Sequence, residues 1–410
     1  MPGKPRVCIV NQYYVPDVAS TGILLHELAR ELAQTGHEVE VITARPSYGP
    51  PESWVACPAR ETFEGVRVTR LRVTRFSKDR TLGRLVNFLS FLIPLFFRML
   101  LGARRDTVYL YSTNPPFLGI VGGLISLVRR HRYVNLLHDA YPDLAVWVGK
   151  IRAGSAIERV WLRLNRLTYS RGRRAIVLCE AAKELVESKW RPPSGTVRVI
   201  HNWTDPAKIT PRPKAESALA REHGLVDPFV ALYSGNLGLY YDFDTLLGAA
   251  ELLKGENFRL VLIGGGGKRD QIARAIKERG LTNTLLLPYV PTDRLGDSLI
   301  ACDTSVVSIA PGIEGISFPS KLYTSLATGR PILAISEERS ELRRMVERED
   351  CGRWFRVGDA SALAEGLRAM MRDRAGCARQ GENSRRFFDR EFTLEAAAAK
   401  YAQVFEEASR

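Results

Sequence analysis

The chain has 410 residues, enough for two or three domains that each bury a core. Its composition, 45% hydrophobic and 25% charged, is that of an ordinary globular protein and excludes pervasive disorder, collagen and a disulfide-rich miniprotein. Six cysteines are scattered without a CxxC pair or a Cys/His cluster, so we expect no structural zinc site and a reducing compartment. A signal peptide would need a longer apolar run near the N-terminus, so we expect a cytoplasmic protein.

The net charge of +14 is concentrated in two stretches of the chain. Residues 60–105 contain eleven Lys or Arg and three acids, and residues 150–174 contain eight and one. Together they carry +15, so the rest of the chain is nearly neutral. A localised excess predicts a localised anionic partner, namely anionic lipid, nucleic acid or a phosphorylated substrate; the alternative is two solvated arginine-rich faces.

The first half of the chain predicts a doubly wound α/β domain, to which we assign residues 1–204. A strand over 6–10, a helix over 22–35 and a strand over 39–43 form a strand–helix–strand unit, which predicts a parallel sheet. Further strands, separated by helices, are expected over 66–73, 107–112, 133–139, 175–179 and 197–202.

A second series of alternating strands and helices predicts another doubly wound domain over 227–390. Residues 205–226 contain three prolines and no strong strand, so we expect them to link the two domains. Strands are expected over 229–235, 259–264, 284–289, 304–309 and 331–336. Helices are expected near 243–253, between the second of these strands and residue 279, and near 321–328. A last helix over about 394–409 has no strand after it. Two such domains would face a cleft, with ligands at the carboxyl ends of the strands.

Residues 85–101 are almost wholly apolar and are flanked by arginines. The polar members are spaced three, four and four apart and so share one helical face: Asn87, Ser90, Pro94 and Arg98. We expect a helix that lies in a membrane surface, with arginines on lipid phosphates; a buried core helix is the alternative. A full span is rejected because Arg98 would be costly inside a bilayer. The arginines expected to contact membrane or acceptor are Arg80, Arg84, Arg98 and Arg104.

Three glycine-bearing turns follow predicted strands and suit phosphate binding by backbone N–H groups. The first ends in Ser20-Thr21-Gly22, the second is SGNLG over 234–238, and the third is GGGGK over 264–268. None matches GxGxxG or a P-loop, so a dinucleotide is not supported. Each turn by itself could equally be structural.

Two further segments carry candidate chemistry. His138-Asp139 ends a predicted strand, where His could act as acid, base or hydrogen-bond donor and Asp could fix its tautomer or serve structure instead. In residues 312–333, Glu314 lies in a glycine-rich loop and Lys321 begins a helix. Lys321 with exposed N–H groups would cradle a diphosphate, and Glu314 could accept hydrogen bonds from sugar hydroxyls or be a solvated loop acid.

With these residues in hand, the chain resembles the family 4 retaining glycosyltransferases of the two-domain GT-B fold, in particular the subgroup that builds colanic-acid-type exopolysaccharide and O-antigen units. Six segments, in matching order and spacing, carry the resemblance: 22–43, LLHDAYPD (136–143), 234–247, IGGGGKR (263–269), LLPYVP (286–291) and PSKLYTSLATGRPIL (319–333). The resemblance implies that the last helix, assigned to 391–410, crosses back to pack on the first domain.

The resemblance also implies roles for residues. A nucleotide sugar would bind the second domain, an acceptor the first, and no metal or other cofactor is needed. The implied catalytic residues are His138, Lys321 and Glu314. The implied donor-binding residues are Gly22, Asn236, Gly264, Gly265, Gly266, Lys268, Tyr289, Val290, Ser317, Pro319, Ser320 and Thr324.

Three departures from the family pattern affect the donor site. The usual Arg and Lys after the second domain's first strand are replaced by Asn236 and Tyr241, so we expect Lys321 to supply the missing charge. The family's Glu-x7-Glu is broken, because its second position falls on Thr324 and its first is represented by Glu314 with a two-residue shift.

The expected function is retaining transfer of a sugar, from a UDP-sugar in preference to a GDP-sugar, to a polyprenyl-diphosphate-linked saccharide at the inner face of the plasma membrane. Two other classes stay open. A nucleotide-sugar 2-epimerase would share the nucleotide loops but would need no membrane surface. A basic nucleic-acid-binding module fits the charge, but no helix-turn-helix, zinc finger or RNP motif is present, so no nucleic-acid partner is expected.

Overall fold

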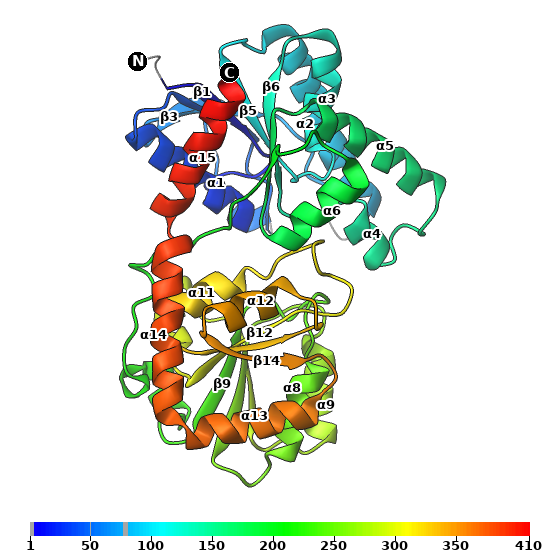
Figure 1. Ribbon diagram of the computed structural model, residues 1–410. Coiled ribbons are helices and arrows are strands. Elements are labelled where there is room, and N and C mark those ends of the chain that lie inside the picture. Colours follow the sequence, from blue (N-terminus) through cyan, green and yellow to red (C-terminus); the bar gives the residue numbers. More distant parts are fainter. Residues whose placement is uncertain (1–3, 50, 77–80) are drawn as a thin grey trace. The chain divides into compact units, whose positions relative to one another are not determined.

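The computed structural model describes residues 4–49, 51–76 and 81–410, and the chain forms two compact units. Unit 1 comprises Met1–His201, Gly315–Phe318 and Leu394–Arg410, and unit 2 comprises Asn202–Glu314 and Pro319–Thr393. Figure 1 shows both as α/β structures with helices around a central sheet. The expected architecture of two doubly wound domains is confirmed.

Unit 1 contains an eight-stranded sheet in the order β3-β4-β2-β1-β5-β6-β7-β8, parallel except for the edge pair β3–β4. The strands are β1 Arg6–Val10, β2 Val39–Ala44, β3 Arg60–Phe63, β4 Val66–Leu71, β5 Thr107–Ser112, β6 Arg132–Leu137, β7 Arg174–Val177 and β8 Val197–Val199. The helices are α1 Ser20–Gln34, α2 Thr81–Gly102, α3 Leu118–Val128, α4 Asp143–Trp147, α5 Ala156–Arg171, α6 Glu180–Trp190 and α15 Leu394–Ser409, with a 3-10 turn at Pro51–Ser53. As expected, the last helix packs on the first domain, where α15 contacts α1, β5 and β6 (Figure 1).

Unit 2 contains a six-stranded, wholly parallel sheet in the order β11-β10-β9-β12-β13-β14. The strands are β9 Phe229–Ser234, β10 Phe258–Ile263, β11 Thr284–Leu287, β12 Thr304–Ser308, β13 Ile332–Ser336 and β14 Gly352–Arg356. The helices are α7 Ala218–Glu222, α8 Asp244–Leu252, α9 Arg269–Glu278, α10 Leu295–Leu299, α11 Lys321–Ala327, α12 Glu341–Arg348, α13 Ala360–Arg372 and α14 Arg374–Glu391, with 3-10 turns at Lys214–Glu216 and Thr292–Arg294.

Residues 205–226, which we expected to link the two domains, contain helix and buried side chains. They belong to unit 2, and α7 begins at the Ser217 N-cap, whose side chain accepts a hydrogen bond from the Ala220 N–H. Leu219 and Leu225 are buried against residues of β9 and β10. The prolines precede this helix, so a segment that reads as connecting chain still supplies core.

Helix α2 is partly a core helix and partly an exposed apolar surface. Phe91, Leu95 and Met99 are buried in the core of unit 1. Two members of the predicted polar face turn inward: Asn87 accepts hydrogen bonds from the Thr74 hydroxyl (2.9 Å) and the Phe76 N–H (3.0 Å), and Ser90 accepts one from the Thr74 N–H (3.0 Å). Pro94, on the same predicted face, is exposed. The exposed apolar side chains are Leu82, Leu85, Leu89, Ile93, Phe97 and Leu101, which we call the α2 stripe. Leu82–Gly102 is long and apolar enough to cross a membrane, but its packing makes it part of the folded unit.

Candidate active site

In unit 2, two loops meet at the carboxyl ends of neighbouring parallel strands, β9 and β10. Both Gly264 and Gly266 have positive φ, where side chains are strained. A Cβ on Gly264 would lie 1.9 Å from the Gly235 carbonyl oxygen, and one on Gly266 would lie 2.3 Å from Asn236 Oδ1. The predicted glycines therefore let the two loops lie backbone against backbone.

Lys321 is the buried cation of this edge. It is the first residue of α11, only 9% exposed, and its Nζ lies 3.8 Å from the ring centroid of Tyr241 and 5.1 Å from that of Tyr233. Its Cε would be 2.6 Å from a Cβ on Gly235, so the side chain runs along the loop after β9. Within the described residues, no carboxylate lies within ion-pair distance of Lys321, and burial lowers its pKa to about 7.

The other residues of unit 2 that we predicted to bind the donor differ in their contacts and exposure. The Lys268 ammonium donates a hydrogen bond to the Tyr241 carbonyl (2.8 Å), so it holds the loop after β9. Tyr289 is 59% exposed and donates to the Gly265 carbonyl (3.0 Å), which lays its ring along the glycine loop. Thr324 donates back to the Lys321 carbonyl within α11 (3.0 Å). Asn236 and Ser320 are exposed, Pro319 is buried, and Val290 packs on the core.

Glu314 is tied to the amino end of α12, not left as a solvated loop acid. Its Oε1 accepts a hydrogen bond from the Glu341 N–H (2.8 Å), and burial raises the pKa of its carboxyl group. Glu337 likewise accepts from the Gly312 N–H (2.8 Å). A cavity of about 530 Å³ within unit 2 is lined in part by these two glutamates.

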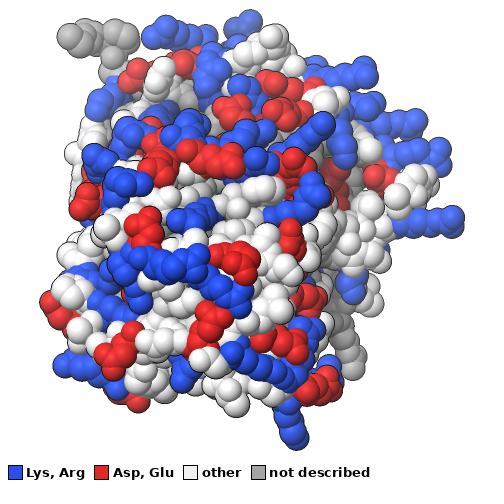
Figure 2. Space-filling model, turned by 60° about the horizontal axis from the view of Figure 1, so that its bottom comes forward, with Lys and Arg blue, Asp and Glu red and all other residues white. Residues whose placement is uncertain are grey.

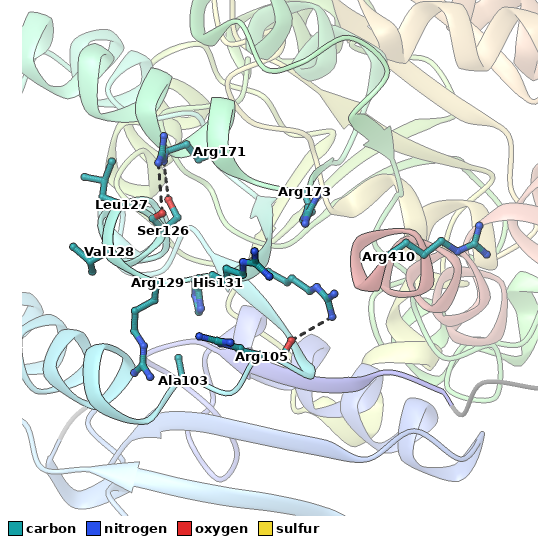
Figure 3. A pocket seen from close by; sticks show the side chains of 12 residues that line it. Ala103, Arg105, Ser126, Leu127, Val128, Arg129, His131, Arg171, Arg173 and Arg410 are labelled. Atoms are coloured by element: carbon teal, nitrogen blue, oxygen red, sulfur yellow. Dashed lines mark hydrogen bonds between the residues drawn. The ribbon is translucent and has the colours of Figure 1, made fainter.

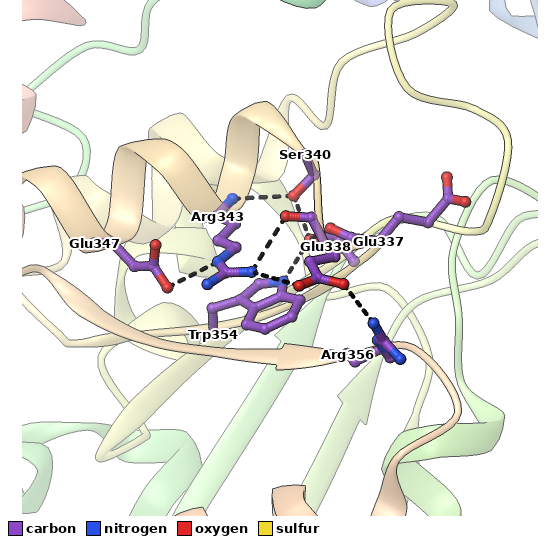
Figure 4. Close-up of polar contacts among 8 residues, drawn as sticks. Glu337, Glu338, Ser340, Arg343, Glu347, Trp354 and Arg356 are labelled. Atoms are coloured by element: carbon purple, nitrogen blue, oxygen red, sulfur yellow. Dashed lines mark hydrogen bonds and ion pairs between the residues drawn. The ribbon is translucent and has the colours of Figure 1, made fainter.

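The turn beside Glu314 is fixed by a polar network, drawn in Figure 4. Arg343 lies over the Trp354 ring at 4.1 Å and donates to Glu347 (2.9 Å), and Arg356 pairs with Glu338. The Trp354 indole N–H donates to Ser336 Oγ (3.0 Å). The network joins α12 to β13 and β14, and so holds the helix end that binds Glu314.

Unit 1 presents a second polar edge, at the carboxyl ends of β1, β5 and β6. His138 directly follows β6, and its backbone N–H donates to Thr113 Oγ1 (3.0 Å). The buried Nδ1 of its ring has no hydrogen-bond partner among the described residues. Burial lowers the pKa of His138 to about 4, so the imidazole is neutral at pH 7. Asn114 on the neighbouring strand end donates to Thr21 at the start of α1 (3.2 Å).

Most of the other residues of unit 1 that we predicted to be functional make contacts within the fold. Asp139 bonds Ser317, within the segment Gly315–Phe318 that belongs to this unit, so Asp139 serves structure rather than the tautomer of His138. Gly22 lies in α1, where a Cβ would be 3.0 Å from the Tyr13 carbonyl oxygen. Arg98 pairs with Glu40 (3.8 Å) and Arg104 with Asp106 (3.2 Å). Arg84 is exposed, and Arg80 lies outside the described residues.

Sequence reasoning missed the residues that hold these groups in place. The Tyr233 and Tyr241 rings flank Lys321, and Thr113 and Asn114 support the edge of His138. Polar residues directly after a strand are a usable signal for the second pair. No local pattern marks the first pair, because one tyrosine lies in a strand and the other in a loop.

Two doubly wound α/β units, each with polar loops at the carboxyl edge of its sheet, are the architecture of the GT-B fold. The chain belongs to glycosyltransferase family 4: residues 21–203 match the glycosyl transferase 4-like domain, and residues 217–387 match the glycosyl transferases group 1 family. It is a nucleotide-sugar-dependent glycosyltransferase.

Proteins with similar sequences match this chain over most of its length. A probable glycosyltransferase WbjE of Pseudomonas aeruginosa is 26% identical over 88% of both chains. A putative colanic acid biosynthesis glycosyl transferase WcaI of Escherichia coli is 25% identical over 83% of this chain and 86% of its own. Among solved structures, Anabaena Alr3699/HepE in complex with UDP has a TM-score of 0.72 at 17% identity, covering 98% of this chain and 99% of its own.

Proposed function

We propose that this protein is a retaining glycosyltransferase that moves a sugar from a UDP-sugar, in preference to a GDP-sugar, to a polyprenyl-diphosphate-linked saccharide in cell-surface polysaccharide assembly. The names of the relatives support the pathway, since one is assigned to colanic acid biosynthesis. Structures of Anabaena Alr3699/HepE that contain UDP or UDP-glucose support the choice of base.

The single observation that carries the donor site is the buried ammonium of Lys321, which lies along the loop after β9 and pairs with no carboxylate of the described residues. When the bond between the sugar C1 and the leaving phosphate oxygen breaks, its electron pair goes to the diphosphate. An ammonium fixed in a poorly solvated site stabilises that charge more strongly than water would. Lys321 would thus replace the charges absent at Asn236 and Tyr241, and its Nζ already lies over the Tyr241 ring.

Retention follows the family resemblance: the acceptor hydroxyl attacks C1 on the face from which the diphosphate leaves, and its proton passes to the departing phosphate oxygen. A neutral His138 suits hydrogen bonding to a sugar hydroxyl, because its lowered pKa prevents it from serving as a cationic acid at pH 7. The exposed ring of Tyr289 would stack on the nucleotide base.

Membrane docking would bring the enzyme to a lipid-linked acceptor. The α2 stripe is an exposed row of large apolar side chains at helical spacing, and such surfaces mark contact with a partner or a membrane. In Figure 2, acidic and basic side chains mix over much of the face shown, while Lys and Arg gather at its right-hand margin. An anionic membrane is the partner that suits the α2 stripe and the arginines that flank it in the sequence, such as Arg84 and Arg105.

Donor binding is expected to stabilise the protein against heat. A nucleotide sugar at about 100 times its dissociation constant should add about 2.7 kcal/mol to the free energy of unfolding. Thermal shifts against UDP-, GDP-, dTDP- and CDP-sugars measure this, and UDP-sugars should give the largest shift. A larger shift with GDP-sugars would overturn the choice of base, and no shift with any donor would contradict the donor site.

Donor affinity is expected to fall as pH rises through about 7. The free Lys321 loses its proton near that pH, whereas a bound diphosphate would keep it protonated, so binding above pH 7 takes up a proton and weakens. Without donor, the sign is opposite for folding: between pH 7 and its ordinary pKa, the unfolded chain holds the proton, so this residue's contribution to stability rises with pH.

Calorimetric titration of donor from pH 6 to 9 checks the first effect. The control is Lys321→Arg, which keeps its charge throughout that range and should show no such decline. An equal decline in both proteins would assign the titration to another group.

A further inference from the structure

Unit 1 contains a basic pocket that has no place in the donor site or in the reaction. It is a hollow of about 980 Å³, and its lining residues include a histidine, two exposed apolar side chains and seven arginines. The arginines are Arg105, Arg129, Arg130, Arg132, Arg171, Arg173 and Arg410. Figure 3 shows labelled members of this set around the hollow, with Arg171 above, Arg105 and Arg129 below, and Arg173 and Arg410 on the right. We call it the arginine pocket.

The topology of unit 1 brings these arginines together at the amino edge of the sheet. Arg105 precedes β5, Arg132 begins β6 and Arg173 precedes β7, and these three strands are neighbours. Arg129 and Arg171 come from the carboxyl ends of α3 and α5, which pack on each other. His138 lies at the opposite end of β6, about 20 Å away at 3.3 Å per residue. The arginine pocket is therefore separate from the edge that holds the candidate active site.

The described residues leave the positive charge of the arginine pocket without ion-pair partners. In the part of the chain that the structure describes, none of the seven guanidinium groups forms an ion pair with a carboxylate. Hydrogen bonds to neutral oxygens instead hold three of them in place. Arg132 donates to the Arg105 carbonyl (3.2 Å), Arg171 to Ser126 Oγ (3.1 Å), and Arg129 to the Leu100 carbonyl. A fixed cluster of unpaired cations is an arrangement that an anion stabilises.

A phosphate group suits the arginine pocket. Planar guanidinium groups bind phosphate through paired N–H donors, and several of them can share its oxygens. His131 adds a second, independent feature: it is 7% exposed and lines the hollow. Its buried Nδ1 has no hydrogen-bond partner among the residues that the structure describes, while its Nε2 bonds the Tyr111 hydroxyl (2.9 Å). Burial, with Arg129, lowers the pKa of His131 to about 4, so it offers a neutral hydrogen-bonding atom.

Apolar surface at the rim selects a lipid. Leu127 and Val128 line the same hollow and are 52% and 68% exposed, and Figure 3 shows them together on one side of it. The bond from Arg129 to the Leu100 carbonyl places the arginine pocket at the end of α2, next to the exposed Leu101 of the α2 stripe. A soluble phosphate would leave this apolar rim in water, whereas a lipid would cover it.

We propose that the arginine pocket binds the phosphate of an anionic membrane lipid, with the lipid chains against Leu127, Val128 and the end of the α2 stripe. The inference rests on the membrane docking of the proposed function and does not depend on the transfer reaction. The arginine pocket would fix one orientation of unit 1 on the bilayer, in addition to the apolar contact made by α2.

Binding to vesicles tests the proposal without donor or acceptor. The variant is R105Q/R130Q/R173Q, whose three side chains are exposed and form no ion pair in the described structure. On phosphatidylcholine vesicles with about 30% phosphatidylglycerol, we expect a loss of about fivefold for each arginine and about 100-fold for the triple variant. The matched control R274Q/K277Q/R372Q removes the same charge from exposed positions of unit 2 and should bind like the unchanged protein.

Two further arms separate the alternatives. L89S/I93S in the α2 stripe should also weaken vesicle binding. If this variant binds vesicles normally while the arginine variant does not, membrane contact by α2 is contradicted and lipid binding by the arginine pocket is supported. Equal loss in the arginine variant and the unit 2 control would overturn the proposal, because only total charge would matter. The proposal would also be overturned if calorimetry showed that binding of pyrophosphate or duplex DNA depends on the three arginines while vesicle binding does not depend on them. Donor-induced thermal shifts should be the same in the arginine variant as in the unchanged protein. This measurement therefore distinguishes failure of the arginine pocket from failure of the proposed donor site.

Discussion

Lys321→Met is expected to lower kcat by about 100- to 1,000-fold without lowering the free energy of unfolding. The rate falls because the leaving diphosphate loses the buried ammonium that α11 holds along the loop after β9. Stability is kept because Lys321 has no carboxylate partner to lose in the part of the chain that the structure describes, and methionine fills a similar volume between Gly235 and the Tyr241 ring. A buried, unpaired ammonium also costs desolvation energy, so its removal can raise stability.

Steady-state kinetics and denaturant unfolding on the same preparations check both halves of this prediction. Lys277→Met is the matched control, since Lys277 is an exposed lysine on α9 of the same unit, and both quantities should stay near those of the unchanged enzyme. Normal turnover by Lys321→Met would remove Lys321 from the proposed mechanism. Equal loss of turnover and stability would assign it a structural role instead.

Much of the fold follows from the sequence because buried parallel strands appear as short apolar runs. Residues 6–10, 229–235 and 259–264 were predicted to within one residue of β1, β9 and β10. The strands that were missed, β3 and β14, are mostly exposed or half-buried and lack such a run. For α2, the spacing identified the polar face, but only the fold shows that Asn87 and Ser90 turn inward to bind Thr74.

The site is less predictable because its parts meet through long-range packing. The position of Lys321 at the start of a helix was visible in the sequence, but its aromatic neighbours come from residues 80 to 90 positions earlier in the chain. The arginine pocket shows the same limit. Arg105, Arg171 and Arg173 lie in the two basic stretches of the sequence, whereas Arg129 and Arg132 do not, and adjacency of β5, β6 and β7 joins them.

The largest loss of donor binding is expected from Gly264→Ala. The new Cβ would lie 1.9 Å from the Gly235 carbonyl oxygen, at a φ of 144° that already strains any side chain. Backbone cannot rotate away from this contact as a side chain could, so the loops after β9 and β10 must separate. Their separation would disturb the hydrogen bonds from the Gly235 N–H to the Ile263 carbonyl (2.8 Å) and from the Leu237 N–H to the Gly265 carbonyl (2.8 Å).

We expect Gly264→Ala to lower the free energy of unfolding by about 3 kcal/mol or more and to weaken donor binding by at least about 100-fold. Gly267→Ala is the control from the same loop, because a Cβ there meets no atom within 4 Å and its φ is ordinary. Its stability should stay within about 0.5 kcal/mol of the unchanged protein. Denaturant unfolding and calorimetric titration of the donor measure both effects. Comparable behaviour of the two variants would show that the loop contact does not shape the site. The expected contrast would separate two contributions, since Gly264 sets the shape of the loops and Lys321 supplies the charge.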